Sequence, residues 1–372
     1  MKRLLLAVLL CACLSAALVV EAQTGSAKPP VPAPKGFFGI DPQAPVNDTD
    51  ARYMKAGGIE TIRWPLAWAA IQPTRKGGYD WGSFDPIVEI AARHGMQVLP
   101  ILYGVPPWLN RKYTRMPIDN GLARKAWIGF VEAAVKRYGP GGDFWNQHAP
   151  GVQYETVIPR PLPIRNWQVW NEANFFYFAY PVSPSRFVRL LKITTPAIKR
   201  IDPSAKVILS GLFGEPTAKG RRGMPAAKFL AAIYRTPGIK RFFDGIALHP
   251  YAAFPEDLEE LVEALHDVTV ENHDRVPMYI TEIGWGSQNN FQEVAFEQGV
   301  RGQVKQLRAA YGYLLENRSR LDIKQVYWFS WRDLADSCSF CDSVGFFREG
   351  TSFRPKPAWR AFVGLSGGRA RP

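Results

Sequence analysis

The sequence has few cysteines. Of the four present, Cys11 and Cys13 lie in an N-terminal apolar run, so only Cys338 and Cys341 remain, spaced as C-x-x-C. A zinc site would need two more ligands nearby, and a thioredoxin-like centre would need a matching βαβ context; neither is evident. We therefore predict a local disulfide between Cys338 and Cys341, and neither a metal nor an organic cofactor.

Long apolar stretches are missing after the first twenty residues, which excludes a later membrane-spanning helix. At the N-terminus, two basic residues precede the apolar run Leu4–Val20, and Val20 and Ala22 suit the −3 and −1 positions of a cleavage site. This is the pattern of a secretory signal peptide over residues 1–22, cleaved after Ala22. Residues 23–36 then form a Pro/Ala-rich flexible tether. The alternative is a lipoprotein modified at Cys13. Either way we expect a secreted or cell-envelope protein without stable membrane insertion.

Nucleic-acid and nucleotide motifs are also missing. The formal net charge is +13, yet no nucleic-acid-binding motif accompanies it, so no nucleic-acid partner is expected. We favour a generally basic surface, with attraction to an anionic polymer or envelope as the alternative. After the first predicted strand comes Gly39-Ile40-Asp41-Pro42 and not the G-x-G-x-x-G of a doubly wound sheet.

What the sequence does contain is a regular alternation of strand-like and helix-like segments, without internal repeats or low-complexity breaks. Eight strands are predicted at Phe37–Ile40, Thr61–Trp64, Gln97–Tyr103, Trp167–Trp170, Lys206–Ser210, Gly245–Leu248, Met278–Thr281 and Gln325–Phe329. Helices are predicted between and after them, at Asp48–Ala56, Phe84–His94, Gly121–Tyr138, Pro184–Ile201, Ala226–Arg235, Pro255–His273, Gln292–Asn317 and Pro357–Leu365.

Eight βα units predict an α/β fold, a single (β/α)8 TIM barrel spanning residues 37–372. An open doubly wound sheet is the alternative fold. The irregular stretch Gly139–Arg165 precedes the fourth strand, so we predict an insertion at the bottom or flank of the barrel.

Two segments indicate the chemistry. Asn166–Asn174 (NWQVWNEAN) and Pro277–Gly286 (PMYITEIGWG) are apolar, aromatic runs that end in a polar tip with one glutamate, Glu172 or Glu282. A strand running into its C-terminal loop has this pattern, and barrel enzymes carry their functional residues there. Two carboxylates placed in this way suggest the acid/base and nucleophile pair of glycoside hydrolysis.

Other strand ends add polar and aromatic side chains to the same face, which suits a carbohydrate because rings stack on aromatics while polar groups bind hydroxyls. Asp41 and Glu215 could equally be loop residues or helix caps. The remaining candidates at these ends are Arg63, Trp64, Trp68, Tyr103, Asn171, Asn174, His249, Tyr251, Trp285, Trp331 and Asp333.

Trp-Asn-Glu after strand four and Thr-Glu-Ile-Gly-Trp after strand seven resemble the retaining (β/α)8 glycoside hydrolases of clan A, most of all families 39 and 5. The resemblance covers residues 37–365. It implies that Glu172 is the general acid/base and Glu282 the nucleophile. A proline often follows the acid/base glutamate in the clan; here Ala173 does, which leaves the acid role in place.

The resemblance also implies substrate-binding roles. Asn171 matches the asparagine that binds the sugar 2-hydroxyl, and Arg63 an arginine that keeps the nucleophile ionised. His249 and Tyr251 match a strand-six pair that lines the sugar site and orients the nucleophile. We further expect Trp285 beside the substrate and Trp331 as an aromatic platform.

The sequence therefore predicts a secreted, monomeric retaining glycosidase with a carbohydrate substrate. In a retaining enzyme the two carboxyl groups should lie ~5–5.5 Å apart, against ~6.5–9.5 Å in an inverting one. A transglycosylase would use the same residues. A catalytically silent carbohydrate-binding barrel is a further alternative, although binding alone does not require two carboxylates.

Overall fold

Eight parallel strands form a closed barrel in the order β1 to β8, which confirms the predicted (β/α)8 fold. The computed structural model describes residues 33–151, 156–158 and 160–372. The predicted signal peptide, the Cys13 alternative and most of the tether lie outside these ranges. The strands are β1 Phe38–Asp41, β2 Thr61–Ala67, β3 Gln97–Tyr103, β4 Asn166–Val169, β5 Lys206–Phe213, β6 Gly245–His249, β7 Met278–Ile283 and β8 Ile323–Phe329.

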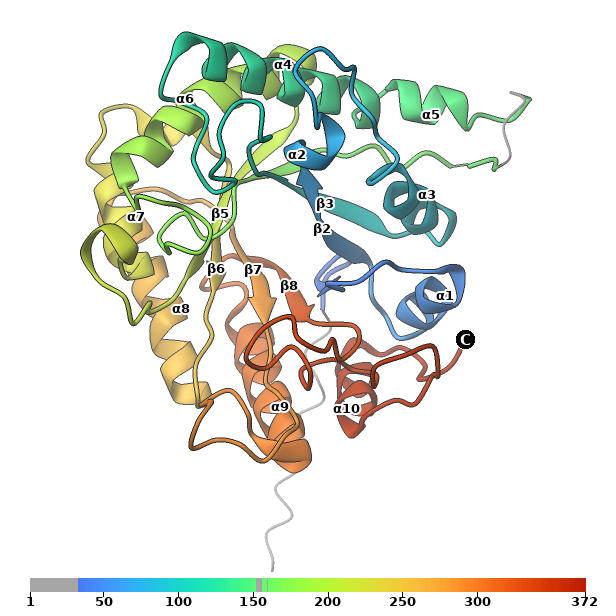
Figure 1. Cartoon of the computed structure of the whole chain (residues 1–372). Helices are drawn as coiled ribbons and strands as arrows, with labels where there is room; N and C mark the ends of the chain where they lie inside the picture. The colour runs from blue at the N-terminus through green and yellow to red at the C-terminus, as the bar shows by residue number, and fades with distance from the viewer. Residues whose placement is uncertain (1–32, 152–155, 159) are drawn as a thin grey trace, which may run out of the picture. The chain divides into compact units, whose positions relative to one another are not determined.

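The helices surround the strands (Figure 1). They are α1 Asp48–Ala56, α2 Trp68–Ile71, α3 Asp85–Arg93, α4 Gly121–Tyr138, α5 Asp143–Gln147, α6 Pro184–Ile201, α7 Ala226–Tyr234, α8 Pro255–Glu271, α9 Gly299–Asn317 and α10 Pro357–Ser366. The short helices α2 and α5 were not predicted, because four or five residues are too few to show a helical period.

Helix α9 begins at Gly299 and not at Gln292, so the prediction for this end was wrong. The physical reason lies in Glu297, which is buried and accepts a hydrogen bond from the backbone N–H of Gln288 at 2.8 Å. Gly299 then adopts a φ of +70°, a left-handed conformation that separates this loop from the helix.

Local capping explains why the other helices begin where the sequence indicates. Asn47 forms a capping box with Asp50 at the start of α1. The side chains of Asn120 and Ser183 accept hydrogen bonds from backbone N–H groups in the first turns of α4 and α6. Proline occupies the first helical position of α6, α8 and α10, where its missing N–H costs nothing.

Inside the barrel, a compact apolar layer lies below the site. It consists of Leu99, Ile208, Ala247, Tyr279 and Tyr327. Since side chains alternate in and out along a strand, Arg63, two residues after Thr61 on β2, points into the barrel above this layer. The hydroxyls of Thr61 and Tyr327, 3.1 Å apart, mark the boundary between the apolar layer and the polar site.

The insertion before β4 packs against the end of α4, as predicted for the flank of the barrel. Phe144 and Trp145 of α5 are buried, and the Trp145 indole N–H donates to the Tyr138 carbonyl at 2.9 Å. Among the described residues, no helix is both long and apolar enough to cross a membrane.

Candidate active site

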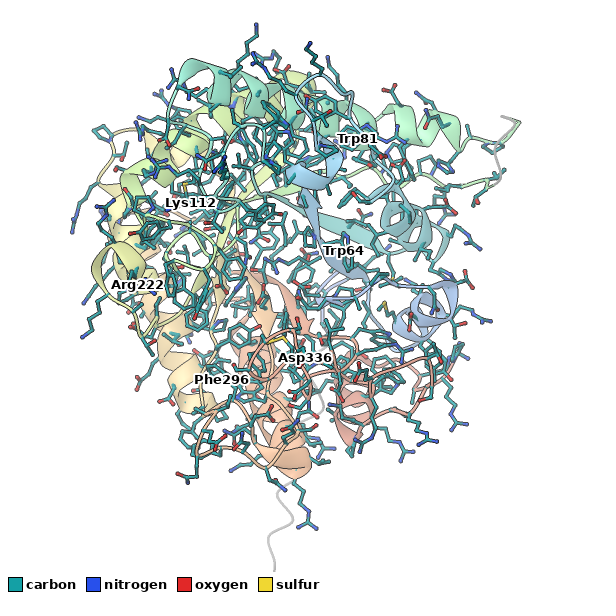
Figure 2. All side chains as sticks on the ribbon, in the orientation of Figure 1. Trp64, Trp81, Lys112, Arg222, Phe296 and Asp336 are labelled. Atoms are coloured by element: carbon teal, nitrogen blue, oxygen red, sulfur yellow. A yellow bond between two sulfur atoms is a disulfide. The ribbon has the colours of Figure 1, made fainter. Side chains whose placement is uncertain are left out.

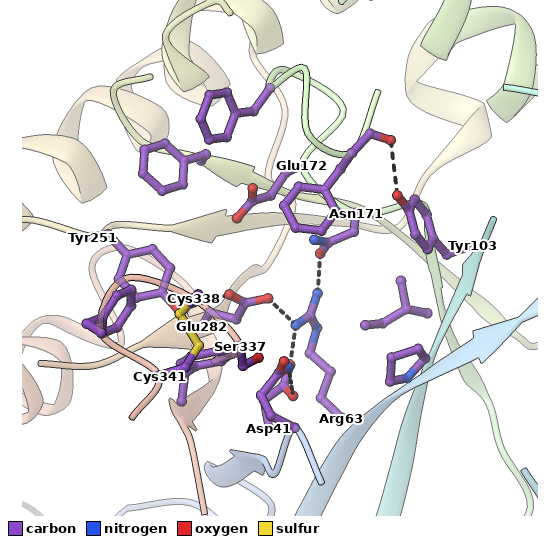
Figure 3. A pocket seen from close by; sticks show the side chains of 18 residues that line it. Asp41, Arg63, Tyr103, Asn171, Glu172, Tyr251, Glu282, Ser337, Cys338 and Cys341 are labelled. Carbon is purple, nitrogen blue, oxygen red and sulfur yellow. Dashed lines mark hydrogen bonds and ion pairs between the residues drawn. A yellow bond between two sulfur atoms is a disulfide. The ribbon is translucent and has the colours of Figure 1, made fainter. Parts of the chain in front are cut away.

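A cavity of about 360 Å³ opens at the C-terminal ends of the strands, where the sequence placed the functional residues. Its polar lining consists of Asp41, Gln43, Arg63, Asn171, Glu172, Glu282 and Ser337. Its aromatic lining consists of Tyr103, Phe175, Phe178, Phe213, Tyr251, Phe329 and Phe340. Figure 3 shows Glu172, from the loop after β4, and Glu282, at the end of β7, in the same cavity. This combination suits a ligand with both ring faces and hydroxyls.

Arg63 is the cation around which the site is built. Its side chain is inaccessible to solvent, and its Nη1 donates to Asp41 at 2.5 Å and to Glu282 at 2.6 Å. Nη2 donates to the Asn171 amide oxygen at 2.6 Å, and Nε donates to Gln168 at 2.8 Å. The planar guanidinium therefore holds together residues from β1, β4 and β7 and the Asn171 loop, which a lysine could not do.

Glu282 accepts hydrogen bonds on both carboxylate oxygens. Arg63 donates to Oε1, and the Tyr251 hydroxyl donates to Oε2 at 2.9 Å. Burial raises the pKa of Tyr251, so the phenol stays protonated and remains a donor. Two donors, one of them a cation, orient this carboxylate and favour its ionised form.

Glu172 has a different partner. His249 Nδ1 and Glu172 Oε1 form a hydrogen bond of 2.8 Å, and the same nitrogen lies 3.4 Å from Glu282 Oε2. Burial lowers the pKa of His249 well below its usual value, so the ring is uncharged. One carboxylate oxygen of each glutamate and one nitrogen of His249 lie within 4.8 Å of one another.

The backbone around Glu172 is unusual. Glu172 and Trp170 both have positive φ angles, +37° and +71°, although neither is glycine. Such conformations cost free energy and are common where a side chain must be aimed at a site. Gly211 makes room for His249, because a Cβ at position 211 would lie 1.9 Å from Nε2 of that ring.

The two glutamates differ in the protonation state that their surroundings favour. Burial raises the pKa of Glu282 to about 7, while Arg63 and Tyr251 oppose this rise. The pKa of Glu172 is raised well above its usual value, first by burial and then by the charge of Glu282. Glu172 is thus the carboxyl that holds a proton and Glu282 the one that ionises first.

Replacing Glu172 by Gln should stabilise the fold at alkaline pH. A carboxyl with a raised folded-state pKa favours the folded state when protonated, and this contribution is lost as the pH rises above the unfolded value of ~4.3. The melting temperature of Glu172→Gln should exceed that of the wild type by about 2 °C or more at pH 8 and match it at pH 4. An equal gain in melting temperature at pH 8 and pH 4 would show that the buried charge of Glu172 is not its cause. Glu293→Gln, at an exposed glutamate, is the control and should change the melting temperature at neither pH.

Two predicted aromatic contacts are wrong. Trp285 is fully buried, and its indole N–H donates to the Ala252 carbonyl at 2.8 Å. Trp331 is 2% exposed, and its indole N–H donates to Asp50 at 2.8 Å. Neither lines the cavity. Both rings satisfy their polar atom within the core, and Phe329 is the aromatic side chain that lines the cavity at the end of β8.

Several site residues were missed or left undecided. Gln168, a lone amide in a buried strand, was not singled out, although its inward position on β4 could have been inferred from alternation. Asp41, left undecided, is a partner of Arg63, whereas Glu215 is exposed and lies outside the cavity lining. The lining residues Phe213 and Phe340 carried no signal that separates them from core aromatics.

Cys338 and Cys341 form a disulfide, as predicted, and both line the cavity together with Ser337 and Phe340. The Phe340 ring packs edge-on against Tyr251, with 5.5 Å between centroids. Tyr251 in turn donates to Glu282. The disulfide loop therefore forms one wall of the site and supports the residue that orients Glu282.

Removing this disulfide should affect the cavity more than the fold. Because it closes a loop of only a few residues, a Cys338→Ser/Cys341→Ser double variant should lose about 2 kcal/mol of unfolding free energy. The cavity wall formed by the disulfide loop would lose its constraint. For a substrate bound in the cavity, KM should therefore rise several-fold while kcat changes less. Chemical unfolding and steady-state kinetics measure the two effects. An unchanged KM would show that the loop keeps its shape without the bond.

Glu172, His249 and Glu282 are also the described residues that could hold a metal ion. The chemistry of the surroundings argues against this use. The positive guanidinium of Arg63 donates to Glu282 at 2.6 Å, where it would repel a metal cation. The donor set fits a hydrogen-bonded carboxyl pair better than a metal centre.

Comparison with known proteins gives the same fold. The family model of glycoside hydrolase family 42, described as beta-galactosidase, matches residues 43–131. Among solved structures, a family 39 glycoside hydrolase from the gut symbiont Bacteroides cellulosilyticus WH2 has a TM-score of 0.63 at 20% identity, over 88% of this chain and 63% of that one. The chain thus spans less than two thirds of that relative. No curated protein matches the sequence.

Two further structures are similar. A monomeric beta-xylosidase from Caulobacter crescentus CB15 has a TM-score of 0.62 at 18% identity, over 89% of this chain and 68% of that one. A thermostable mutant of a xylanase from Cellvibrio japonicus has a TM-score of 0.62 at 14% identity, over 91% of this chain and 99% of that one. The chain therefore has the (β/α)8 fold of clan A glycoside hydrolases. At these identities the likeness shows the fold, and the activity has to be argued from the site.

Proposed function

We propose that the protein is a retaining glycoside hydrolase that uses Glu172 as acid/base and Glu282 as nucleophile. The observation that carries the proposal is the paired carboxyl groups, with one oxygen of each and a His249 nitrogen all within 4.8 Å of one another. This short separation supports the ~5–5.5 Å of double displacement over the ~6.5–9.5 Å of an inverting enzyme.

In the first step, a Glu282 oxygen attacks the anomeric carbon and forms a covalent ester. The bond between that carbon and the leaving-group oxygen breaks, and Glu172 donates its proton to this oxygen. Because the hydrogen bond with His249 Nδ1 engages Oε1 of Glu172, the other oxygen is the one that can carry the transferable proton. The raised pKa of Glu172 supplies that proton near neutral pH.

In the second step, Glu172 is a carboxylate and accepts a proton from water. The resulting hydroxide attacks the anomeric carbon, and the ester bond to Glu282 breaks. Arg63 and Tyr251 stabilise the departing Glu282 carboxylate through the hydrogen bonds described above. Asn171, held by Arg63, faces the same cavity and can accept or donate to a sugar hydroxyl.

Hydrolysis with retention is the test. A panel of aryl glycosides should identify a sugar that the wild type turns over, and proton NMR should show that the first-formed product keeps the anomeric configuration of the substrate. Initial formation of the opposite anomer would overturn the proposal. Transfer of the glycosyl unit to a sugar instead of water would identify a transglycosylase acting through the same intermediate.

We also propose that the protein works outside the cytoplasm. The support is the disulfide of Cys338 and Cys341, since such bonds persist in oxidising compartments, together with the leader-like sequence over residues 1–22.

A further inference from the structure

An uncharged aromatic loop, residues 175–180, leads out of the cavity shortly after Glu172. Phe175 and Phe178 line the cavity, while Phe176 and Tyr177 continue the run outward. The Phe175 and Tyr177 ring centroids are 4.9 Å apart, and those of Phe176 and Tyr177 are 4.1 Å apart. Tyr177 is 63% exposed, although it is a large aromatic side chain. The loop therefore presents a continuous ring surface from the candidate acid to solvent.

This loop lies between two cations. The Arg222 guanidinium lies 3.8 Å from the centroid of the Phe176 ring, and Lys112 Nζ lies 5.2 Å from that of Tyr180. The Phe176 N–H also donates to the Arg222 carbonyl at 2.9 Å, which fixes the two loops together. Lys112 and Arg222 lie on the same side of the barrel in Figure 2.

Neither cation has a carboxylate partner among the residues that the structure describes. Both are exposed, and the same is true of their neighbours Arg111, Lys219 and Arg221. When a guanidinium stacks on a ring, its N–H groups lie at its edge and stay free to bind a carboxylate in a bidentate way. Arg222 therefore has its donors available beside the exposed Tyr177.

Among the loops around the mouth of the cavity, the excess of positive charge lies in those beside the aromatic loop. The loops 104–120 and 214–225, on either side of the aromatic loop, carry six basic residues against two acidic ones, Asp119 and Glu215. Of these, Asp119 already pairs with Arg115 and Arg186. The loop 284–298 after β7 carries two acidic residues and no basic one. The positive charge thus faces one side of the cavity mouth.

We propose that this surface, formed by Tyr177, Arg222 and Lys112, binds a uronic-acid unit of an acidic polysaccharide. A pyranose ring would stack on the exposed aromatic side chain, while its carboxylate would bind the free edge of Arg222. This inference rests on the proposed function, since it names the substrate class of the same site. Part of the net charge of +13 would then serve to bind an anionic substrate.

Binding of uronate polymers tests the proposal. Polygalacturonate, alginate and hyaluronate are titrated into the Glu282→Gln protein, so that no polymer is consumed, with methyl-esterified polygalacturonate as the uncharged match to the first. At least one polyuronate should bind, and added salt should weaken its binding. Arg222→Gln should raise the Kd about tenfold, the effect of losing one charge-assisted pair.

Arg308→Gln is the matched control, because Arg308 is exposed on α9 and has no ion pair among the described residues. It should change the Kd less than twofold, whereas Tyr177→Ser should weaken binding to a similar extent as Arg222→Gln. Equal effects of Arg222→Gln and Arg308→Gln would show non-specific attraction and overturn the proposal. So would equal binding of the methyl-esterified polymer, or no binding of any polyuronate. Hydrolysis of neutral aryl glycosides by the wild type tests the proposed function separately.

Discussion

Glutamine in place of Glu282 is expected to lower kcat on any glycoside substrate by roughly 10⁴-fold or more, because the variant cannot form the proposed covalent intermediate. The amide keeps the size of the carboxylate; its one oxygen can accept from Arg63, and its NH2 group can donate to the Tyr251 hydroxyl in place of the oxygen that accepted from it. The loss should therefore appear in turnover and not in folding. Steady-state kinetics on the best aryl glycoside, with circular dichroism to verify the fold, measure both.

Glu172→Gln provides the contrast that separates the two roles. Its kcat should fall by roughly 10²–10⁴-fold on substrates with poor leaving groups, and much less on activated aryl glycosides that need no proton. Glu282→Gln should be inactive on both kinds of substrate. Glu293→Gln, at an exposed position on the loop after β7, should retain wild-type activity. If all three variants turn over equally, the assignment of this pair is wrong.

Replacing Arg63 by Met should destabilise the protein by about 3–5 kcal/mol, because Asp41 and Glu282 would remain buried without their cation. Activity should fall at the same time, since the pKa of Glu282 would rise further and Asn171 would lose its support. Chemical unfolding at neutral pH measures the stability. The loss should shrink as the pH falls, because protonated carboxyls no longer need a counter-charge.

A double-variant cycle keeps this prediction testable if Arg63→Met folds poorly. Asp41→Asn removes one of the two buried charges, so Arg63→Met/Asp41→Asn should be more stable than Arg63→Met alone. Additive losses would show that the ion pair is not the source of the effect. Arg63→Lys should lie between wild type and Met, because it keeps the charge but cannot reach all four acceptors.

The sequence was sufficient to predict the barrel and the meeting of Glu172 and Glu282 at one end of it. The alternation of strand and helix patterns is strong over long segments, so α4 and α6 have the predicted bounds. Glu172 and Glu282 follow apolar runs too short to be anything other than strands in this context. Their meeting then follows from topology, because the C-terminal ends of parallel strands share one face.

The direction of single aromatic side chains could not be predicted in the same way. Trp285 and Trp331 follow the strands in irregular loops, where the two-residue alternation no longer applies. Their indole N–H groups find acceptors at Ala252 and Asp50, which are distant in sequence and could not be paired from it. The pairing of Asp41 with Arg63 could not be read from the sequence for the same reason.

The Arg63 network also determines when in folding the site can exist. Its acceptors come from both halves of the chain: Glu282 is 219 positions from Arg63 in the sequence, and Asp41 is only 22 positions away. A fragment that ends before β7 would retain Arg63 with Asp41 but would lack Glu282, the proposed nucleophile. Contacts this distant in sequence form late, since the barrel must close first. Recovery of turnover after dilution from denaturant would therefore report barrel closure itself, separately from the earlier gain of helical signal.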